Sequence, residues 1–200
     1  MRRSFSAVVD RFAAPLTLVL ALTALSDAAL AAQSASLEEQ VAAALLPLPE
    51  SLRAGAEVVQ LGVDGVPHRL RAGTNGMICL ADNPGDTLFD VRCYHARFMP
   101  VIYRRRALVH DGLTDSAAVA EVDREIQAGQ LLPRPWDGSA GYRMLGPISA
   151  YDVAHRAAGD AIDRWQSVHL PYATAEQLGV SEQEQGIEPY LMAGGTWWAH

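Results

Sequence analysis

Apolar residues recur at helical spacing in three stretches of the chain, and each stretch begins with a helix-start signal. Ser36 and Glu39 have the spacing of a capping box before the first stretch. Pro100 suits the first turn of the second stretch, and Thr114 is a typical N-cap for the third. The sequence therefore predicts helices over 37–46, 100–110 and 115–128, with a short helical turn at 174–178.

Short apolar or alternating runs separated by turn residues predict the strands. Runs 57–61 and 66–71 flank Asp64 and Gly65, and runs 77–80 and 89–93 flank the turn residues 82–86. Four short strands joined by tight turns indicate an antiparallel meander of hairpins. Further strands are expected at 141–145, 164–170, 190–193 and 196–200. The expected fold class is α+β, an antiparallel sheet with two or three helices packed on one face.

The N-terminal 32 residues have the pattern of a cleaved signal peptide. Arg2 and Arg3 precede an uncharged apolar run over 12–25, and Ala29 and Ala31 supply a small-residue cleavage site. The run is shorter than the ~20 residues needed to span a bilayer, so no membrane anchor is expected after cleavage. Residues 33–200 would then form one exported domain, periplasmic or extracellular. The arginine pair leaves both the general secretory route and the twin-arginine route open.

Cys79 and Cys93 are the two cysteines of the chain, and the predicted hairpin makes them cross-strand neighbours. In an exported domain two cysteines indicate one disulfide, because the compartments outside the cytoplasm are oxidising. Closing a loop of roughly 15 residues should stabilise the fold by about 3 kcal/mol. The same pairing argues against a cysteine nucleophile, which would need a free thiolate.

The charge composition argues against two classes of partner. The chain has a formal net charge of −7, and all 16 of its basic residues are arginines. An acidic domain without a basic stripe is not expected to bind nucleic acid or to dock on anionic lipid.

Arg105 conflicts with its position, because it falls in the middle of the apolar face of the predicted 100–110 helix. That face is formed by Phe98, Val101, Ile102, Leu108 and Val109. One interpretation is a structural arginine paired with a buried acid such as Asp82, Asp90 or Asp163. The other is an anion clamp, since a guanidinium suits carboxylate or phosphate.

Histidines near predicted strand ends are the weak catalytic candidates. His95 or His169 would act as the base of a hydrolase in which Arg105 holds an anion. These residues and His200 could also converge on zinc or copper, but no histidine has the local spacing of a metal motif. Neither a metal site nor a cofactor is expected.

Aromatic residues concentrate in the last third of the chain, and they fit either a core or a ligand site. Trp197 and Trp198, if on a strand, must point to opposite faces, so one ring should be buried and the other exposed. Trp165 and Trp198 are therefore candidates, with Arg105, for contacts to a small anionic or sugar-like ligand.

Segments 74–82 and 93–95 resemble exported bacterial proteins, and the resemblance implies no particular activity. No motif for nucleophilic catalysis or phosphate binding is present in the sequence. The expected function is non-catalytic binding or a structural role in the cell envelope, with the hydrolase as the alternative.

Overall fold

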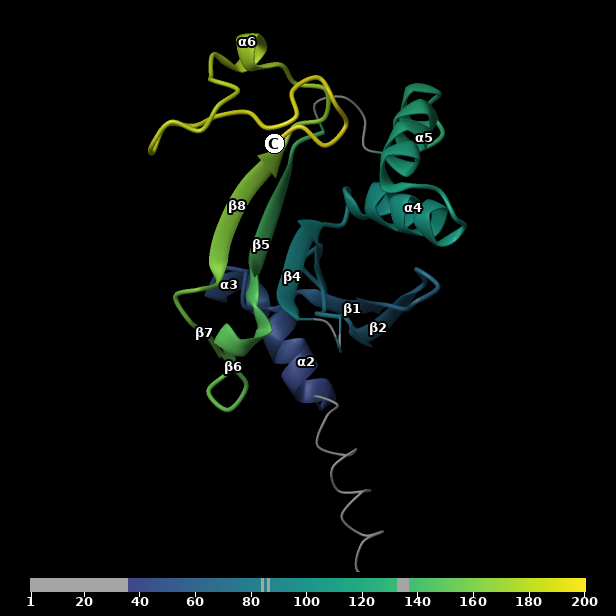
Figure 1. Ribbon diagram of the computed structural model, residues 1–200. Coiled ribbons are helices and arrows are strands. Elements are labelled where there is room, and N and C mark those ends of the chain that lie inside the picture. Colours follow the sequence, from purple (N-terminus) through teal and green to yellow (C-terminus); the bar gives the residue numbers. More distant parts are fainter. Residues whose placement is uncertain (1–35, 84, 86, 133–136) are drawn as a thin grey trace, which may run out of the picture. The chain divides into compact units, whose positions relative to one another are not determined.

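A computed structural model describes residues 36–83, 85, 87–132 and 137–200 (Figure 1). The predicted signal peptide, 1–32, lies outside the described residues. The helices are α2 (Leu37–Ala44), α3 (Glu50–Arg53), α4 (Met99–His110), α5 (Asp115–Gln127) and α6 (Ala175–Leu178), with a 3-10 turn at Ile148–Ala150. The main strands are β1 (Glu57–Leu61), β2 (Pro67–Arg71), β3 (Met77–Leu80), β4 (Leu88–His95), β5 (Ser139–Pro147) and β8 (Asp163–His169). The short strands β6 (Tyr151–Asp152) and β7 (Ala157–Ala158) form a separate pair.

The helix starts follow the predicted local signals. The Ser36 side chain accepts the backbone N–H of Glu39, and the Glu39 carboxylate accepts that of Ser36, which completes the capping box of α2. Thr114 caps α5 by accepting the N–H of Ala117. Pro100 lies in the first turn of α4, where its missing N–H removes no helical hydrogen bond.

The six-stranded sheet has the order β2-β1-β3-β4-β5-β8, and it is mixed. The predicted hairpins β1–β2 and β3–β4 are both antiparallel, as are β4–β5 and β5–β8. The meander is wrong at one point, because β1 pairs with β3 in parallel and Val58 lies opposite Cys79. The first hairpin therefore joins the second through β1 instead of through β2, its later strand.

The helices lie on both faces of the sheet, so their predicted placement on one face is wrong. On one face, Ala44, Leu45 and Leu48 of the α2 region pack with Val58 and the two cysteines. On the other face, Met99 of α4 packs with Val59 and Leu80. Successive strand residues point to opposite faces, so Val58 and Val59 belong to different cores. Figure 1 shows α2 and α3 apart from α4 and α5, with strands between them.

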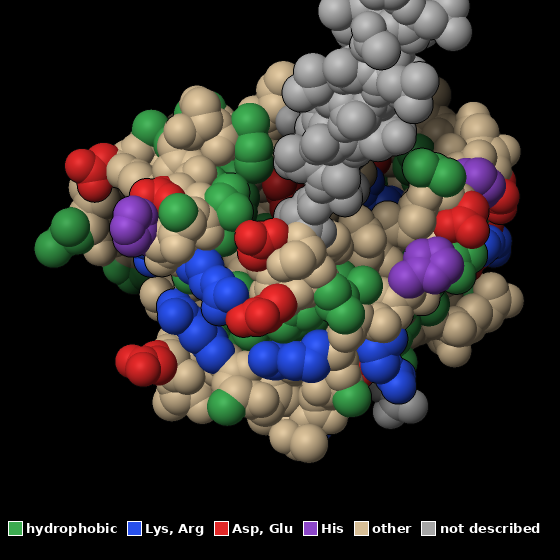
Figure 2. Space-filling view, turned by 90° about the horizontal axis from the view of Figure 1, so that it is seen from below, with side chains coloured by type: hydrophobic (Ala, Val, Ile, Leu, Met, Phe, Trp, Pro, Cys, Tyr) green, Lys and Arg blue, Asp and Glu red, His purple; other side chains and the backbone are tan. Residues whose placement is uncertain are grey.

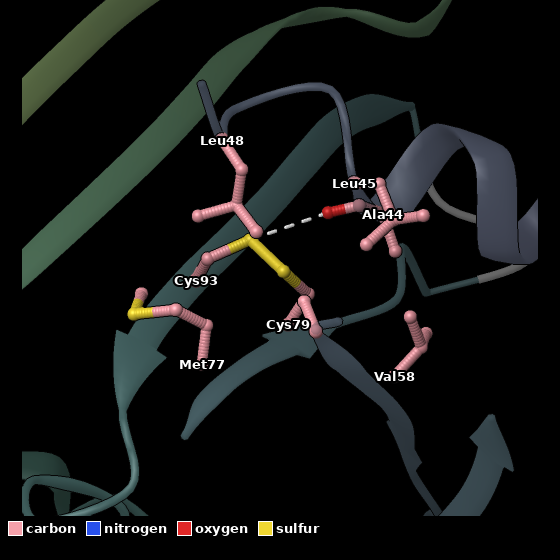
Figure 3. Packing of buried hydrophobic residues seen from close by; sticks show 8 residues of the cluster. Ala44, Leu45, Leu48, Val58, Met77, Cys79 and Cys93 are labelled. Carbon is pink, nitrogen blue, oxygen red and sulfur yellow. Dashed lines mark hydrogen bonds between the residues drawn. A yellow bond between two sulfur atoms is a disulfide. The ribbon is translucent and has the colours of Figure 1, made fainter. Parts of the chain in front are cut away.

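Cys79 and Cys93 form a disulfide at the centre of the cluster that includes Ala44, Leu45, Leu48 and Val58, which we call the α2 core. They lie opposite each other in the β3–β4 register, and their sulfur atoms are 2.06 Å apart. Both residues are fully buried, between Leu48, Met77 and Val58 (Figure 3). The Cys93 sulfur also contacts the carbonyl oxygen of Ala44 at 3.4 Å. The disulfide therefore ties the hairpin together beneath α2.

The C-terminal segment, residues 190–200, packs beside α5. It does not form the two predicted strands over 190–193 and 196–200. Met192 and His200 exchange backbone hydrogen bonds, but Ala193 and Gly195 between them have positive φ angles of 55° and 76°. These conformations turn the chain sharply instead of extending it. The Trp197 indole donates to the carbonyl oxygen of Val119 on α5.

Surface charges of opposite sign are mixed. Figure 2 shows arginine side chains beside acidic ones on one face. Two of the exposed ion pairs are Arg69–Glu57 and Arg156–Glu38. Pairs of this kind contribute little to stability, because water screens them. Within the part of the chain that the structure describes, no helix is long and apolar enough to cross a membrane.

Candidate functional site

A cleft of about 810 Å³ opens on the sheet face that carries α4 and α5, and we call it the aromatic cleft. Strands β4, β5 and β8 form its floor, helices α4 and α5 form one wall, and the C-terminal segment forms the other. The floor includes Arg92, Tyr94, Arg143, Trp165 and His169. The helical wall includes Phe98, Ile102, Arg105 and Val119, and the C-terminal wall includes Tyr190, Trp197, Trp198 and His200.

The strand register explains the order of side chains on the floor. Arg92, Arg143 and Trp165 are direct partners on adjacent strands, so they form one row across the sheet. The next row of side chains on the same sheet face lies two residues further along each strand and contains Gly141. Because Gly141 has no side chain, the space above it is open to a neighbouring residue. A Cβ at Gly141 would lie 2.7 Å from Nε2 of His169. The imidazole of His169 therefore lies over Gly141.

The arginine row is held by one carboxylate. Asp90 accepts hydrogen bonds from Nε of Arg92 and from Nε of Arg143, both at 2.9 Å, and each arginine donates a second bond through Nη2. Burial alone would raise the pKa of Asp90, but the bonds from Arg92 and Arg143 outweigh it and lower that pKa to about 2. The Arg143 guanidinium also lies 5.5 Å from the ring centroid of Trp165. Two guanidinium groups on one carboxylate leave one positive charge in excess within this row, and the carboxylate of Glu188, which also lines the cleft, balances it formally.

Arg105 reaches the cleft from α4. Its Nη2 donates to Oδ1 of Asp115 at the start of α5, at 2.5 Å, so its partner is none of the three acids considered from the sequence. The Asp115 side chain is 66% exposed, whereas that of Arg105 is 26% exposed. The Nε atom of Arg105 is buried and has no hydrogen-bond partner among the described residues. A buried donor without a partner costs about 1–3 kcal/mol, which a bound acceptor would recover.

His169 is the most buried ionisable group of the cleft, with 7% of its surface exposed. Its ring stacks on Phe98, with centroids 4.2 Å apart, and lies 4.9 Å from the ring of His200. Burial, and then the charge of His200, lower the pKa of His169 to about 3, although a hydrogen bond between the imidazole and the backbone of Trp198 acts in the opposite direction. Its Nδ1 has no hydrogen-bond partner in the described part of the chain.

His95 lies away from the aromatic cleft. It follows Cys93 by two residues on β4 and pairs with Met77, so it belongs to the sheet face that carries α2. The sequence hypothesis grouped His95 with His169, but strand alternation separates them. Within residues 36–83, 85, 87–132 and 137–200, no group of three or more His, Cys, Asp or Glu residues could hold a metal ion.

The tryptophans divide between the core and the cleft rim. Trp197 is 3% exposed, whereas Trp198 is 40% exposed. One ring is thus buried and the other is not, although a turn instead of a strand produces this arrangement. Trp165 is 43% exposed on β8. Trp165 and Trp198 therefore present partly exposed aromatic surface to the cleft that also contains Arg105 and His169.

Three cleft residues, Arg92, Tyr94 and Arg143, were not singled out from the sequence. The alternation of β4 carried a signal for two of them, because Phe89, Val91 and Cys93 face the α2 core and leave Arg92 and Tyr94 on the other side. Arg143 joins them only through the β4–β5 register, which links positions 51 residues apart, and no local pattern encodes that pairing.

A second cavity of about 370 Å³ lies on the other side of Arg92, between α4 and the β1–β2 hairpin. Arg106 lines it together with Arg92, but Asp82 and Asp90 line it as well. The formal charges of these four residues cancel. None of the described residues that line this cavity has a buried polar side-chain atom without a partner, whereas Arg105 and His169 of the aromatic cleft do.

The chain matches no protein-family model, no curated protein and no solved structure. Function must therefore be argued from the chemistry of the site. That chemistry combines apolar and aromatic surface, three guanidinium groups, and two buried polar atoms that find no partner in the described chain. Such a site can hold an amphipathic small molecule in a fixed orientation.

Proposed function

We propose that residues 33–200 form an exported, non-catalytic binding protein that holds a small amphipathic anion in the aromatic cleft. The observation that carries this proposal is the buried Nε of Arg105, which has no acceptor among the described residues and belongs to a side chain that lines the cleft. A carboxylate fits this donor best, because a guanidinium presents parallel N–H groups to its two oxygens.

The surrounding charges favour an anion at this place. Arg92 and Arg143 share the single carboxylate of Asp90, and Arg105 pairs with Asp115, which is largely exposed. An exposed carboxylate is well solvated, so Asp115 is able to leave Arg105 at little cost when a ligand carboxylate arrives. Arg92, Arg105 and Arg143 thus offer three guanidinium groups to an anion in a chain with net charge −7, and Asp90, Asp115 and Glu188 balance their formal charge.

The remainder of the cleft suits an apolar or aromatic ligand body. Ile102 and Val119 line the helical wall of the cleft. Trp165 on the floor and Trp198 on the C-terminal wall are partly exposed. A cleft of about 810 Å³ is within the range of small-molecule sites. Flat rings pack on tryptophan faces, so an aromatic carboxylate is the simplest ligand that uses both features.

Binding is better supported than hydrolysis. A histidine base is normally oriented by a third group, yet within the described residues the Nδ1 of His169 donates no hydrogen bond to a carboxylate. Its pKa of about 3 also makes it a poor proton acceptor near neutral pH. His95, the other candidate base, lies on the opposite sheet face from the cleft.

Export is supported by the N-terminal pattern and by the disulfide. Residues 1–32 combine arginines, an apolar run and a small-residue cleavage site. Cys79 and Cys93 are bonded in the core, and disulfides persist in oxidising compartments. Both observations support export, so we place the proposed binding role outside the cytoplasm.

The experiment is a thermal-shift comparison with hydrocinnamate, a phenylpropionate, and with its neutral amide. Saturation about 100-fold above Kd should stabilise the native state by about 2.7 kcal/mol, which raises the midpoint by roughly 5–10 °C. Arg105→Met should abolish the shift. Arg104→Met is the matched control, because Arg104 lies on the same helix and pairs with Glu125 outside the cleft. The proposal fails if the amide shifts the midpoint equally, if hydrocinnamate shifts nothing, or if both variants respond alike.

A further inference from the structure

The buried Nδ1 of His169 is a second polar atom of the cleft that lacks a partner in the described structure. The residue is 7% exposed, so bulk water does not compensate the missing hydrogen bond. Nothing in the binding of an anion by Arg105 uses this atom. A ligand group that reaches His169 would satisfy it.

The imidazole is fixed on several sides, so its unpartnered nitrogen has a defined direction. Phe98 stacks on one face of the ring at 4.2 Å and 21°, and Gly141 lies against the ring with no side chain. His200 and Tyr94 contact it at centroid distances of 4.9 Å and 5.7 Å. A side chain held this firmly is suited to select among ligands, because its ring cannot rotate to accommodate a ligand that lacks the matching polar group.

Helix α4 sets how far apart Phe98 and Arg105 lie along the cleft. Phe98, Ile102 and Arg105 are spaced by four and three residues, so they lie along one helix face. Arg105 is seven residues beyond Phe98, and a rise of 1.5 Å per residue places it about 10 Å along the axis. Since Phe98 stacks on His169, the backbone of Arg105 lies about 10 Å further along the helix than the residue that contacts the imidazole.

We propose that His169 is the specificity-determining residue of the aromatic cleft, and that the ligand is a hydroxylated aromatic carboxylate. Its carboxylate would bind Arg105, its ring would lie along Ile102, and its hydroxyl would hydrogen-bond Nδ1 of His169. This inference rests on the proposed anion-binding function and adds the second functional group of the ligand.

A hydroxyl is the group that this environment favours. The neutral imidazole presents either an N–H or a lone pair at Nδ1, and a hydroxyl can accept from the first or donate to the second. An ammonium group would be buried beside the guanidinium groups of the cleft, and a second carboxylate would lose its hydration against a neutral ring. An apolar group would leave the nitrogen unsatisfied.

The test compares two ligands by calorimetric titration of the full domain. Phloretate is hydrocinnamate with a para-hydroxyl, so the pair differs by the proposed contact alone. Wild type should bind phloretate roughly two- to tenfold more tightly, the range expected of one neutral hydrogen bond. His169→Phe keeps an aromatic ring on Phe98 and removes the nitrogen, so it should bind both ligands equally.

Ser139→Ala is the matched control. Ser139 lies opposite His169 in the β5–β8 register and also has a buried oxygen without a partner in the described residues, but it does not line the cleft. This variant should keep the preference for phloretate. Loss of the preference in Ser139→Ala, or its survival in His169→Phe, overturns the inference.

A measurement on wild type keeps the inference testable if His169→Phe does not fold. The ¹⁵N resonance of His169 Nδ1 should shift on saturation with phloretate and stay in place with hydrocinnamate. Equal Arg105-dependent affinity for both ligands, with no Nδ1 shift, would overturn the inference and leave the proposed binding function intact. Failure of both ligands to bind would instead overturn the proposed function.

Discussion

The imidazole of His169 stacks on the ring of Phe98, with centroids 4.2 Å apart and an angle of 21° between the planes. Phe98 precedes α4 and His169 ends β8, so this contact joins the helical wall of the cleft to its floor. The stacking and burial that fix the ring also disfavour its protonated form.

Acid should therefore destabilise the domain through His169. Its pKa falls from 6.5 when unfolded to about 3 in the native state, so its contribution is complete above pH 6.5 and declines as the pH drops toward 3. The unfolded state binds the extra proton, and the slope is at most about 1.4 kcal/mol per pH unit. Urea unfolding at several pH values should show this slope in wild type and a shallower one in His169→Phe. Identical slopes in the two proteins would refute the assignment, and His155→Phe, at an exposed histidine, serves as the control.

Removing the disulfide should lower the free energy of unfolding. Cys79 and Cys93 are separated by 14 residues, and a loop of that size corresponds to about 3 kcal/mol. The Cys79→Ala, Cys93→Ala double variant should lose at least this amount, because both sulfur atoms are fully buried and their removal leaves space in the α2 core. Urea unfolding measures the difference. A double variant as stable as wild type would contradict the role assigned to the disulfide.

Asp90→Asn should destabilise the sheet by about 1–3 kcal/mol, because it leaves Arg92 and Arg143 side by side without a shared carboxylate. The loss of unfolding free energy should be smaller than for a fully buried ion pair, because the three side chains are 24–34% exposed and water partly screens their charges. Asp152→Asn removes an exposed acid that pairs with His155 and should have no measurable effect. Chemical unfolding of both variants checks the prediction, which fails if they are equally stable.

Local features of the chain were predictable from sequence, whereas long-range pairing was not. The capping residues Ser36 and Thr114 predicted the starts of α2 and α5, because a cap acts within three residues. The parallel pairing of β1 with β3 depends on which strand of the first hairpin meets the second hairpin. The polar residues of β2 suit an edge strand, but they do not fix the direction in which β1 meets β3. Likewise, the partner of Arg105 depends on how α5 folds back on α4, which brings Asp115 within reach.

The candidate site was predictable in part for the same reason. Arg105 stood out because a charge on an apolar helix face is a local anomaly, and it does line the cleft. His95 was placed with His169 because both end strands, but the alternation of β4 assigns His95 to the face of Cys93. The unpartnered Nδ1 of His169 could not be predicted, since it depends on contacts from Phe98 and Gly141 in other parts of the chain.

The mature protein should begin near Ala32 or Gln33. The arginines, the apolar run and the small residues at positions 29 and 31 direct cleavage to this point. N-terminal sequencing of the protein recovered outside the cytoplasm checks it. An exported protein that still begins at Met1 would rule out the cleaved signal peptide.

The most direct measurement of the central claim is the N–H resonance of Arg105 Nε, followed by ¹H–¹⁵N correlation spectroscopy during a titration with hydrocinnamate. This buried donor has no acceptor in the described residues, whereas Nε of Arg104 already donates to both carboxylate oxygens of Glu125 at 2.9 Å. The ligand carboxylate should shift the Arg105 resonance downfield and slow its exchange with water, and it should leave the Arg104 resonance in place. A saturating titration that leaves the Arg105 resonance unchanged, or moves both resonances equally, would contradict anion binding by Arg105.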